Sequence, residues 1–411
     1  MKSVKKLNLL PSMQSRMVKQ LLIPLLFLLF AVLCAFVIYT HFHRKSNTVA
    51  SIVDTPTETV MISDHFSGEV YFNNEFDQNE FSRAIISAIN GAKKRIDVAV
   101  YSMDHTLNRD ALYRAADRGV KVTLLLSKNR ASTHNKIFTD LPPNIERIDV
   151  GSVNTSTSGY MHHKFVLIDR GEPGAKLLFG SYNFTLLQEK YDPSFLMETT
   201  RPELIQIFGT EFDRIHTSAI SRATDPLLSR NPFAAHIIYP EGYIDIWFTP
   251  SVSSGKQNLF TYFLNLIRNA QKNIEVMIWQ MTDKNIAKAL VSKAKTGIPI
   301  RILTDDYNFS LKDSAFPYLL EQKKIYNLNA LEVLTDYRRN IEVEKKYGEK
   351  NLNSFLHHHL MLIDGQTALF GTNNWSTNGF FNNDESIMVS NIPYIFSSFK
   401  AAFDANYAKA E

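Results

Sequence analysis

The sequence repeats itself at a distance of 178 residues. Segment 84–126 aligns without a gap with segment 262–304, and identical residues fall at matched places in the two copies. These identities include Ala92 with Ala270, Ile96 with Ile274, Met103 with Met281, Leu112 with Leu290 and Gly119 with Gly297. A period this long indicates a duplicated domain, because solenoid repeats span only about 20–50 residues. The chain is therefore expected to contain two similar halves.

Each copy has the pattern of an α/β unit. An amphipathic segment is followed by a short apolar run, a second amphipathic segment, a glycine and a second apolar run. The apolar runs are 96–101 and 120–126 in the first copy, and 274–279 and 298–304 in the second. Strands that alternate with helices favour an α/β fold. We predict two mixed or parallel sheets flanked by helices.

The first 65 residues differ in character from the rest. Residues 21–39 carry no charged side chain and are long enough to cross a bilayer as a helix. Positive residues are more numerous before this segment than after it, which favours a cytoplasmic N-terminus and an extracytoplasmic C-terminal part. A cleaved signal peptide is the alternative, but no small-x-small cleavage site follows. The predicted parts are a cytoplasmic segment 1–20, a transmembrane anchor 21–40, a stalk 41–65, a first half 66–225 and a second half 240–411.

Composition adds few constraints. The 411 residues include 45% apolar and 21% charged residues, as in folded globular proteins. The net charge of +4 is too small to indicate nucleic acid as the partner, although it does not exclude it. The single cysteine, Cys34, rules out an intrachain disulfide.

Polar motifs occur at matched places in the two halves. Residues 159–185 read GYMHHKFVLIDRGEPGAKLLFGSYNFT and residues 354–377 read SFLHHHLMLIDGQTALFGTNNWST. Superposition pairs His162 with His357, Lys164 with His359, Asp169 with Asp364, Gly180 with Gly371, Ser181 with Thr372 and Asn183 with Asn374. Two copies of H-x-K-x4-D followed by G-S-x-N resemble the phospholipase D superfamily over about residues 66–400. The second copy departs from the pattern, because His359 replaces the lysine.

Strand periodicity predicts which motif side chains point together. Side chains two positions apart share one face of a strand, so His162 and Lys164 should point the same way. Asp169 lies an odd number of positions from His162, so we interpret it and Asp364 as supports of local structure, although the motif places both among the catalytic candidates. Histidines 163 and 358 are expected to be structural.

These residue types suit phosphodiester cleavage. A neutral histidine can attack phosphorus, and a protonated one can supply the leaving group's proton. The family resemblance implies this mechanism, with a phosphohistidine intermediate and without a metal or cofactor. We favour His162 as the nucleophile over His357, and the converse stays open. The candidate substrate-binding residues are Asn183, Asn374, Ser181, Thr372 and His359.

A carboxylate is expected to orient a catalytic imidazole. Glu385 lies eleven positions after Asn374, where the resemblance places such a residue. In the first half Asp192 is the candidate counterpart, with Glu198 as a second choice. The matched aromatic residues Tyr101 and Trp279 are interpreted as core.

The resemblance implies a phosphodiesterase, and the anchor favours phospholipid in a membrane as its substrate, with hydrolysis or phosphatidyl transfer as the reaction. A membrane-tethered nuclease acting on nucleic acid is the alternative. The missing lysine raises a third hypothesis, a non-catalytic protein that binds phosphate. If the protein is active, His359 would become positive only under acidic conditions, so we expect acidic conditions to favour activity. One chain carries both motif copies, so a monomer should suffice.

Overall fold

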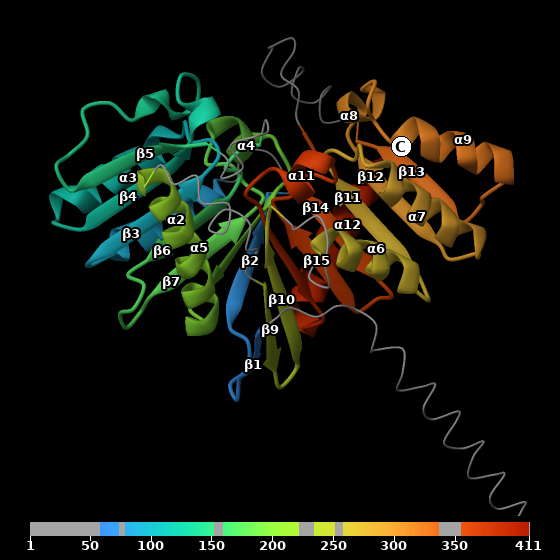
Figure 1. Cartoon of the computed structure of the whole chain (residues 1–411), viewed down its shortest axis with the longest axis horizontal. Coiled ribbons are helices and arrows are strands. Elements are labelled where there is room, and N and C mark those ends of the chain that lie inside the picture. The colour runs from blue at the N-terminus through green and yellow to red at the C-terminus, as the bar shows by residue number, and fades with distance from the viewer. Residues whose placement is uncertain are drawn as a thin grey trace, which may run out of the picture. The chain divides into compact units, whose positions relative to one another are not determined.

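Two β-sheets, one for each half, organise the chain (Figure 1). The computed structural model describes residues 58–73, 79–151, 159–221, 234–250, 258–336 and 355–410. The predicted cytoplasmic segment, the anchor and most of the stalk lie outside these residues. Within the described ranges, none of the helices combines the length and apolar character that a membrane span requires.

The first-half sheet has seven strands in the order β2-β8-β7-β6-β3-β4-β5. β3 pairs with β4 in parallel, and β4 pairs with β5 in parallel, whereas the remaining neighbouring pairs are antiparallel. The sheet is therefore mixed. The strands are β2 (Gly68–Phe72), β3 (Arg95–Val100), β4 (Lys121–Ser127), β5 (Ile145–Val150), β6 (Lys164–Ile168), β7 (Lys176–Gly180) and β8 (Phe195–Thr199).

The second-half sheet has nine strands in the order β1-β9-β10-β16-β15-β14-β11-β12-β13. Its segment β16-β15-β14-β11-β12-β13 repeats the order β8-β7-β6-β3-β4-β5 of the first sheet, as the duplication predicts. The strands are β1 (Glu58–Met61), β9 (Ala234–Tyr239), β10 (Gly242–Phe248), β11 (Ile274–Ile278), β12 (Ile300–Thr304), β13 (Leu331–Thr335), β14 (His359–Ile363), β15 (Thr367–Gly371) and β16 (Ser386–Ser390).

Strand β1 lies inside the segment predicted as stalk. Its four residues pair in parallel with β9 of the second-half sheet, with Glu58 opposite Ala235 and Met61 opposite Ile238. The short run ETVM lacks an extended hydrophobic pattern, so its strand character depends on the edge that β9 offers. The fold therefore begins earlier in the chain than position 66.

Helices cover the sheets and fill the space between them. The helices are α2 (Glu80–Gly91), α3 (Thr106–Asp117), α4 (Leu186–Lys190), α5 (Pro202–Ser221), α6 (Leu259–Asn269), α7 (Lys284–Lys295), α8 (Asp306–Ser310), α9 (Phe316–Tyr326), α11 (Thr377–Phe381) and α12 (Pro393–Tyr407). Side chains of α2 and α3 pack on one face of the first-half sheet. Those of α5 and α12 join a core that contains residues of both sheets.

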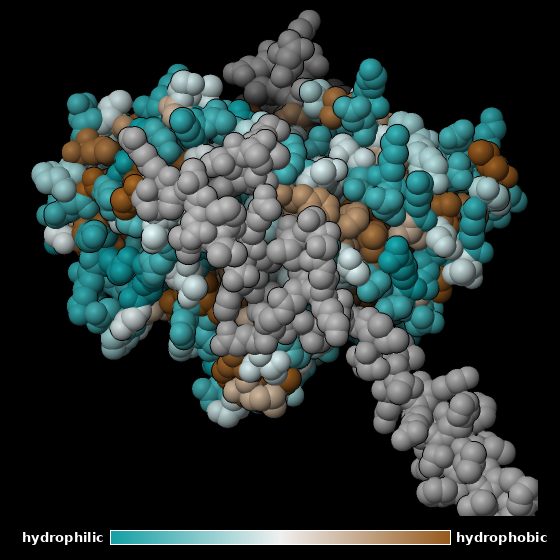
Figure 2. Space-filling view, in the orientation of Figure 1, coloured by the Kyte–Doolittle hydropathy of each residue, from teal (hydrophilic) through white to brown (hydrophobic). Residues whose placement is uncertain are grey.

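Strand β6 shows how the sequence pattern produces this packing. All five of its residues are buried, and the four apolar ones after Lys164 alternate between the two cores: Phe165 and Leu167 face the core shared by both sheets, whereas Val166 and Ile168 face α2 and α3. A short apolar run is typical of a strand covered on both faces. The visible described surface is mostly hydrophilic, as expected when such strands lie inside (Figure 2).

Candidate active site

A cleft with a volume of about 670 Å³ is lined by residues of both halves. His162 lies two positions before the first residue of β6, His357 stands in the same place before β14, and both line the cleft. Asn183 and Asn374 of the two G-S-x-N segments line it as well. The structure therefore brings the two motif copies to one cleft.

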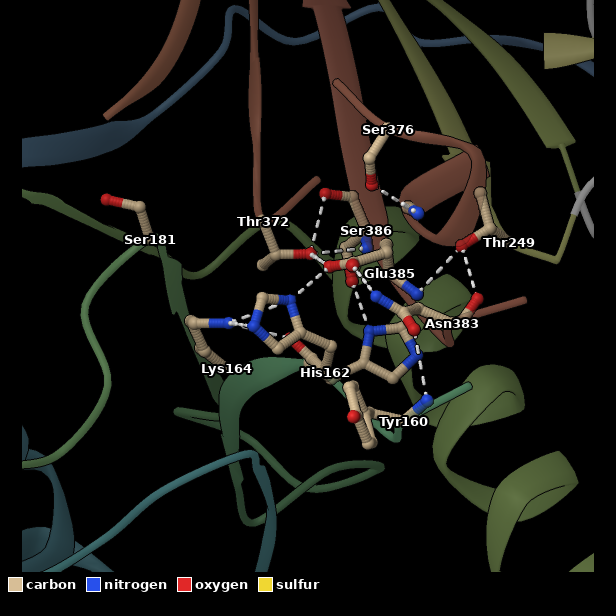
Figure 3. Close-up of polar contacts among 12 residues, drawn as sticks. Tyr160, His162, Lys164, Ser181, Thr249, Thr372, Ser376, Asn383, Glu385 and Ser386 are labelled. Atoms are coloured by element: carbon tan, nitrogen blue, oxygen red, sulfur yellow. Dashed lines mark hydrogen bonds and ion pairs between the residues drawn. The ribbon is translucent and has the colours of Figure 1, made fainter. Parts of the chain in front are cut away.

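The ring of His162 bonds to a carboxylate from the opposite half (Figure 3). Its Nδ1 lies 2.7 Å from Oε2 of Glu385, the residue just ahead of β16. A carboxylate only accepts hydrogen bonds, so Nδ1 carries the proton and the lone pair is on Nε2. Burial, together with the neighbouring Lys164, holds the pKa of His162 well below its ordinary value. This neutral ring can act as a nucleophile.

Glu385 is fixed by several hydrogen bonds within its own half. Thr372 Oγ1 donates to Oε2 at 2.7 Å, and Asn383 Nδ2 donates to Oε1 at 2.8 Å (Figure 3). The backbone N–H of Glu385 donates to Thr249 Oγ1 at 3.0 Å. Burial raises the pKa of the carboxyl to about 7. The protonation of this residue therefore changes near neutral pH.

Lys164 lies beneath His162 and is fully buried. Its Nζ donates to the carbonyl oxygen of His162 at 2.8 Å and lies 3.3 Å from each ring nitrogen. Burial lowers the pKa of Lys164 to about 7, while the Glu385 carboxylate opposes that change. An ammonium at this position can hold a phosphoryl oxygen next to His162.

His357 has a different partner. Its Nδ1 donates to the backbone carbonyl of Ser181 in the first half at 3.0 Å, so its Nε2 also carries the lone pair. Burial holds the pKa of His357 well below its ordinary value, and Lys164 and His162 add to the effect. A carbonyl fixes the ring orientation without the negative charge that Glu385 offers to His162.

The position that matches Glu385 in the first half holds a serine. Glu385 lies eleven positions after Asn374, and the residue eleven positions after Asn183 is Ser194. The pairing of β7 with β8 has the same register as that of β15 with β16, which supports this match. The predicted counterpart, Asp192, is two positions away from it.

The two alternative carboxylates have other contacts. Oδ1 of Asp192 accepts a hydrogen bond from the backbone N–H of Phe355 at 2.8 Å. This bond links the first half to the segment that precedes His357. Glu198 lies on β8 and forms an ion pair with Lys176 of β7 at 2.5 Å. Neither carboxylate is bonded to a cleft histidine in these contacts.

His359 replaces the motif lysine and is also buried. Neither ring nitrogen has a hydrogen-bond partner among the described residues. The ring borders a small cavity with Phe263, Trp375 and Phe380, and it does not line the large cleft. Burial, together with the neighbouring His357, holds the pKa of His359 well below its ordinary value. The expected positive charge under mildly acidic conditions is therefore not supported.

The other candidate substrate-binding residues fall into two groups. The side-chain oxygens of Asn183 and Asn374 have no partner among the described residues, so both amides are available at the cleft. The hydroxyl of Ser181 accepts the N–H of Phe195, and that of Thr372 donates to Glu385 as noted above. Both hydroxyls are buried and engaged in these hydrogen bonds, through which they position the site.

Asp169 and Asp364 lie at the opposite ends of their strands from the cleft histidines. Asp169 has φ +47° and accepts the backbone N–H groups of residues 93, 94 and 95 at 2.8–2.9 Å. Asp364 has φ +58° and accepts those of residues 271, 272 and 273. They support local structure, as strand periodicity predicted.

The histidines beside the motif positions are also structural. His163 bonds through Nδ1 to Ser386 Oγ at 2.6 Å and through Nε2 to Glu211 Oε1 at 2.9 Å. His358 is stacked on Phe195 with ring centroids 6.4 Å apart. Within the described ranges, no group of three or more His, Cys, Asp or Glu side chains is arranged to hold a metal ion.

Sequence reasoning missed the aromatic lining of the cleft. Tyr101 packs edge-on against His162 with centroids 4.5 Å apart, and Trp279 packs on His357 at 5.4 Å. Both residues line the cleft, which the interpretation as core did not anticipate, although Tyr101 is buried as that interpretation expected. Their position directly after matched strands was the available signal, because strand ends commonly form sites in α/β folds.

Known proteins resemble this chain in sequence and in fold. The family model described as "Cardiolipin synthase, PLD-like domain" matches residues 85–216 and 263–407. A phospholipase D of Rickettsia prowazekii (strain Madrid E) is 32% identical over 109 residues, which are 26% of this chain and 49% of that protein. The mitochondrial cardiolipin hydrolase of Xenopus laevis is 20% identical over 145 residues, 35% of this chain and 59% of that protein. The chain thus spans about half the length of the curated relatives it matches.

A solved structure covers more of the chain. The phosphatidylserine synthase of Haemophilus influenzae Rd KW20 has a TM-score of 0.64 and 15% sequence identity, and the match covers 89% of this chain and 91% of that one. At this identity the similarity shows the fold. The family model matches both halves and together covers more than half of the sequence, so the chain belongs to the phospholipase D superfamily, in the family of cardiolipin synthase PLD-like domains.

Proposed function

We propose that the protein is a membrane-anchored phosphodiesterase that cleaves phospholipid head groups, by hydrolysis or by phosphatidyl transfer. The observation that carries this proposal is the placement of His162 and His357, from separate halves, at one cleft, with each ring bonded through Nδ1 to the opposite half. The names of the relatives support a phospholipid substrate. The uncharged segment 21–39 supports a membrane location with the two halves outside the cytoplasm.

In the first step, Nε2 of neutral His162 attacks phosphorus. Glu385 accepts the hydrogen bond from Nδ1, and its negative charge stabilises the positive charge that develops on the ring. Lys164 and the side-chain amides of Asn183 and Asn374 hold the non-bridging oxygens. The bond from phosphorus to the leaving alkoxide breaks, and the alkoxide takes a proton from Nε2 of protonated His357.

The proton on His357 is available once substrate is bound. Burial and the nearby cations keep this ring neutral in the empty cleft, whereas an anionic phosphodiester beside it raises its pKa by Coulomb attraction. In the second step, Nε2 of His357 removes a proton from water or from an acceptor alcohol. The oxygen attacks phosphorus, and the bond to His162 breaks. The neutral histidine is regenerated.

The histidine roles can be tested with a phosphodiester that has a p-nitrophenol leaving group. Such a leaving group needs no proton, so His357→Ala should still form the covalent intermediate but hydrolyse it slowly. With ³²P in the substrate, His357→Ala should retain acid-labile label on the protein, and His162→Ala should retain none. Label on His162→Ala but not on His357→Ala would reverse the assignment.

Substrate class can be tested on the full-length protein in detergent micelles. Labelled phosphatidylglycerol and phosphatidylcholine are compared with single-stranded DNA, for the wild type and for both histidine variants. Turnover of lipid that is lost in both variants is expected. Turnover of DNA alone would favour the nuclease, and ligand binding without turnover of any of these substrates would favour the non-catalytic hypothesis.

A further inference from the structure

The two sides of the cleft differ in chemistry beyond the histidines. On the first-half side the guanidinium of Arg130 lies over the ring of Tyr101, with Cζ 4.9 Å from the ring centroid. On the second-half side Trp279 is followed outward by two further aromatic rings. The centroids of Trp279 and Phe355 are 5.6 Å apart, and those of Phe355 and Tyr307 are also 5.6 Å apart. Arg130 thus gives the first-half side a cation, whereas three aromatic rings in series extend the second-half side.

The second half supplies no matching cation. Among its described residues that line the cleft there is no lysine or arginine. Arg130 follows β4 of the first half, beyond the segments that the repeat aligns without a gap.

Arg130 has no acidic partner in the described part of the chain. No ion pair or hydrogen bond of its guanidinium occurs there, and its Nε is buried without a partner. The side chain lines the cleft and is half-buried, whereas Lys164 is fully buried beneath His162. A guanidinium supported on an aromatic ring, with its donors free, is suited to binding a phosphate or carboxylate.

We propose that Arg130 selects substrates that carry a second acidic group close to the reacting phosphodiester. This proposal rests on the proposed function, in which the reacting phosphate lies between His162 and His357 and is held by Lys164. The second acidic group then reaches Arg130 on the first-half side. The aromatic residues Trp279, Phe355 and Tyr307 contact the apolar part of the same lipid. The substrate class is an anionic phospholipid with a second phosphate or a carboxylate joined to the first phosphate by a short linker.

The test compares lipids that differ in the second acidic group. Phosphatidylglycerol has none, phosphatidylserine has a carboxylate, and cardiolipin has a second phosphate. Each is presented to the full-length protein in phosphatidylcholine vesicles. Loss of hydrogen bonds to a charged group should lower the preference of Arg130→Gln for the doubly acidic lipid by roughly ten- to a hundred-fold, mainly through KM. Arg130→Lys should retain part of the preference. Of phosphatidylserine and cardiolipin, the lipid for which Arg130→Gln loses more of its preference identifies the acidic group that Arg130 binds.

Lys128 offers the matched control, because it is an exposed cation in the same 3-10 turn and does not line the cleft. Lys128→Gln should leave the lipid preference unchanged. If Arg130→Gln lost activity equally on all three lipids, the proposal would be overturned, since the arginine would then act through Tyr101 and His162. An unchanged preference would overturn it as well.

A binding experiment keeps this proposal separate from the proposed function. If no lipid is turned over, calorimetry can compare inorganic pyrophosphate with inorganic phosphate as ligands of the full-length protein. Tighter binding of pyrophosphate by the wild type, lost in Arg130→Gln and kept in Lys128→Gln, would support the second subsite even without catalysis. Equal affinities of the wild type for the two anions would overturn it.

Discussion

The two cleft histidines occupy unequal surroundings although their motif copies match. His162 bonds to the Glu385 carboxylate and has the Lys164 ammonium beside it, whereas His357 bonds to a backbone carbonyl and has His359 in the place of the lysine. A carboxylate stabilises an imidazole that becomes positive more than a carbonyl does. The surroundings therefore favour His162 as the nucleophile of the proposed mechanism.

Replacing Glu385 by glutamine tests this inequality. Glutamine keeps an acceptor for His162 but removes the negative charge, so kcat should fall roughly ten- to a hundred-fold while KM changes little. Steady-state kinetics on the lipid that is turned over provide the measurement. Glu198→Gln, on β8 and away from the cleft, is the matched control and should change kcat by less than about twofold. A loss of kcat that is equally large in both variants would point to a general structural effect.

The pH dependence of kcat/KM follows from Lys164 and Glu385. Glu385 must be ionised to accept the hydrogen bond from Nδ1 of His162, so activity should fall as the pH drops through about 7. Lys164 must be protonated to hold the phosphoryl oxygen, so activity should fall as the pH rises through about 7. A bell-shaped profile with its maximum near neutral pH is expected from kcat/KM measured between about pH 5 and pH 9.

His359 should contribute to neither side of this profile near neutral pH, because burial holds its pKa well below the ordinary value. The variant His359→Gln is therefore expected to leave the acidic and the alkaline limb of the pH profile unchanged. The variant His359→Lys tests whether a cation can be restored at that position. A shift of the acidic limb in His359→Gln would contradict this view. Such a shift would support the hypothesis that protonated His359 binds phosphate.

At the scale of elements, each motif strand is fixed at both ends. In the first half, the Asp169 carboxylate binds three successive backbone N–H groups of the turn between α2 and β3. At the other end, Gly180 allows β7 and β8 to approach, because a Cβ there would collide with the carbonyl oxygen of Phe195. Asp169 thus fixes the end of β6 that lies away from the cleft, and Gly180 lets the neighbouring strand β7 pack against β8.

Asp169→Asn should lower stability without acting on the chemistry. Burial alone would raise the pKa of Asp169, but the N–H groups of residues 93–95 outweigh it and lower the pKa below its ordinary value. A carboxyl with a lowered pKa contributes stability that is complete above its unfolded-state value of about 3.9 and is lost as the pH falls through the folded-state value. The variant should lose about 1–3 kcal/mol of unfolding free energy at pH 7.

Urea unfolding at several pH values measures this effect. The gap between wild type and Asp169→Asn should narrow as the pH falls below about 4 and through the lowered folded-state pKa, where the wild-type carboxyl becomes protonated. Asp364→Asn is the parallel variant in the second half. Asparagine tolerates the left-handed backbone at both positions, so the comparison isolates the charge. A large fall in kcat at unchanged stability would instead place Asp169 in the reaction.

The sequence predicted the elements better than it predicted the contacts between halves. The repeat and the two-residue alternation of strands correctly indicated the α/β units, the shared face of His162 and Lys164, and the structural role of Asp169. The bond between His162 and Glu385 could not be predicted, because spacing within one half says nothing of which side chains cross to the other. The parallel pairing of β1 with β9 was missed for the same reason.

At the scale of the whole molecule, the two halves depend on one core. Side chains of both sheets, α5 and α12 belong to it, and Phe399 of α12 lies between them. Its ring centroid is 5.0 Å from that of Phe195 in the first-half sheet and 4.4 Å from that of Phe370 in the second. The distance between His162 and His357 is therefore set by packing that both halves share.

Phe399→Ala should accordingly weaken the whole fold and not one half. Truncation of a buried phenylalanine costs about 3–5 kcal/mol, and calorimetry or urea unfolding of the full-length protein should show this loss in a single transition. Tyr394→Ala is the control on the same helix, since Tyr394 is 47% exposed and its loss should change stability by less than about 0.5 kcal/mol. Two separate transitions, with only one of them shifted by Phe399→Ala, would show that each half folds on its own core. Activity would then depend on docking of the halves, because each half supplies only one of the two motif histidines at the cleft.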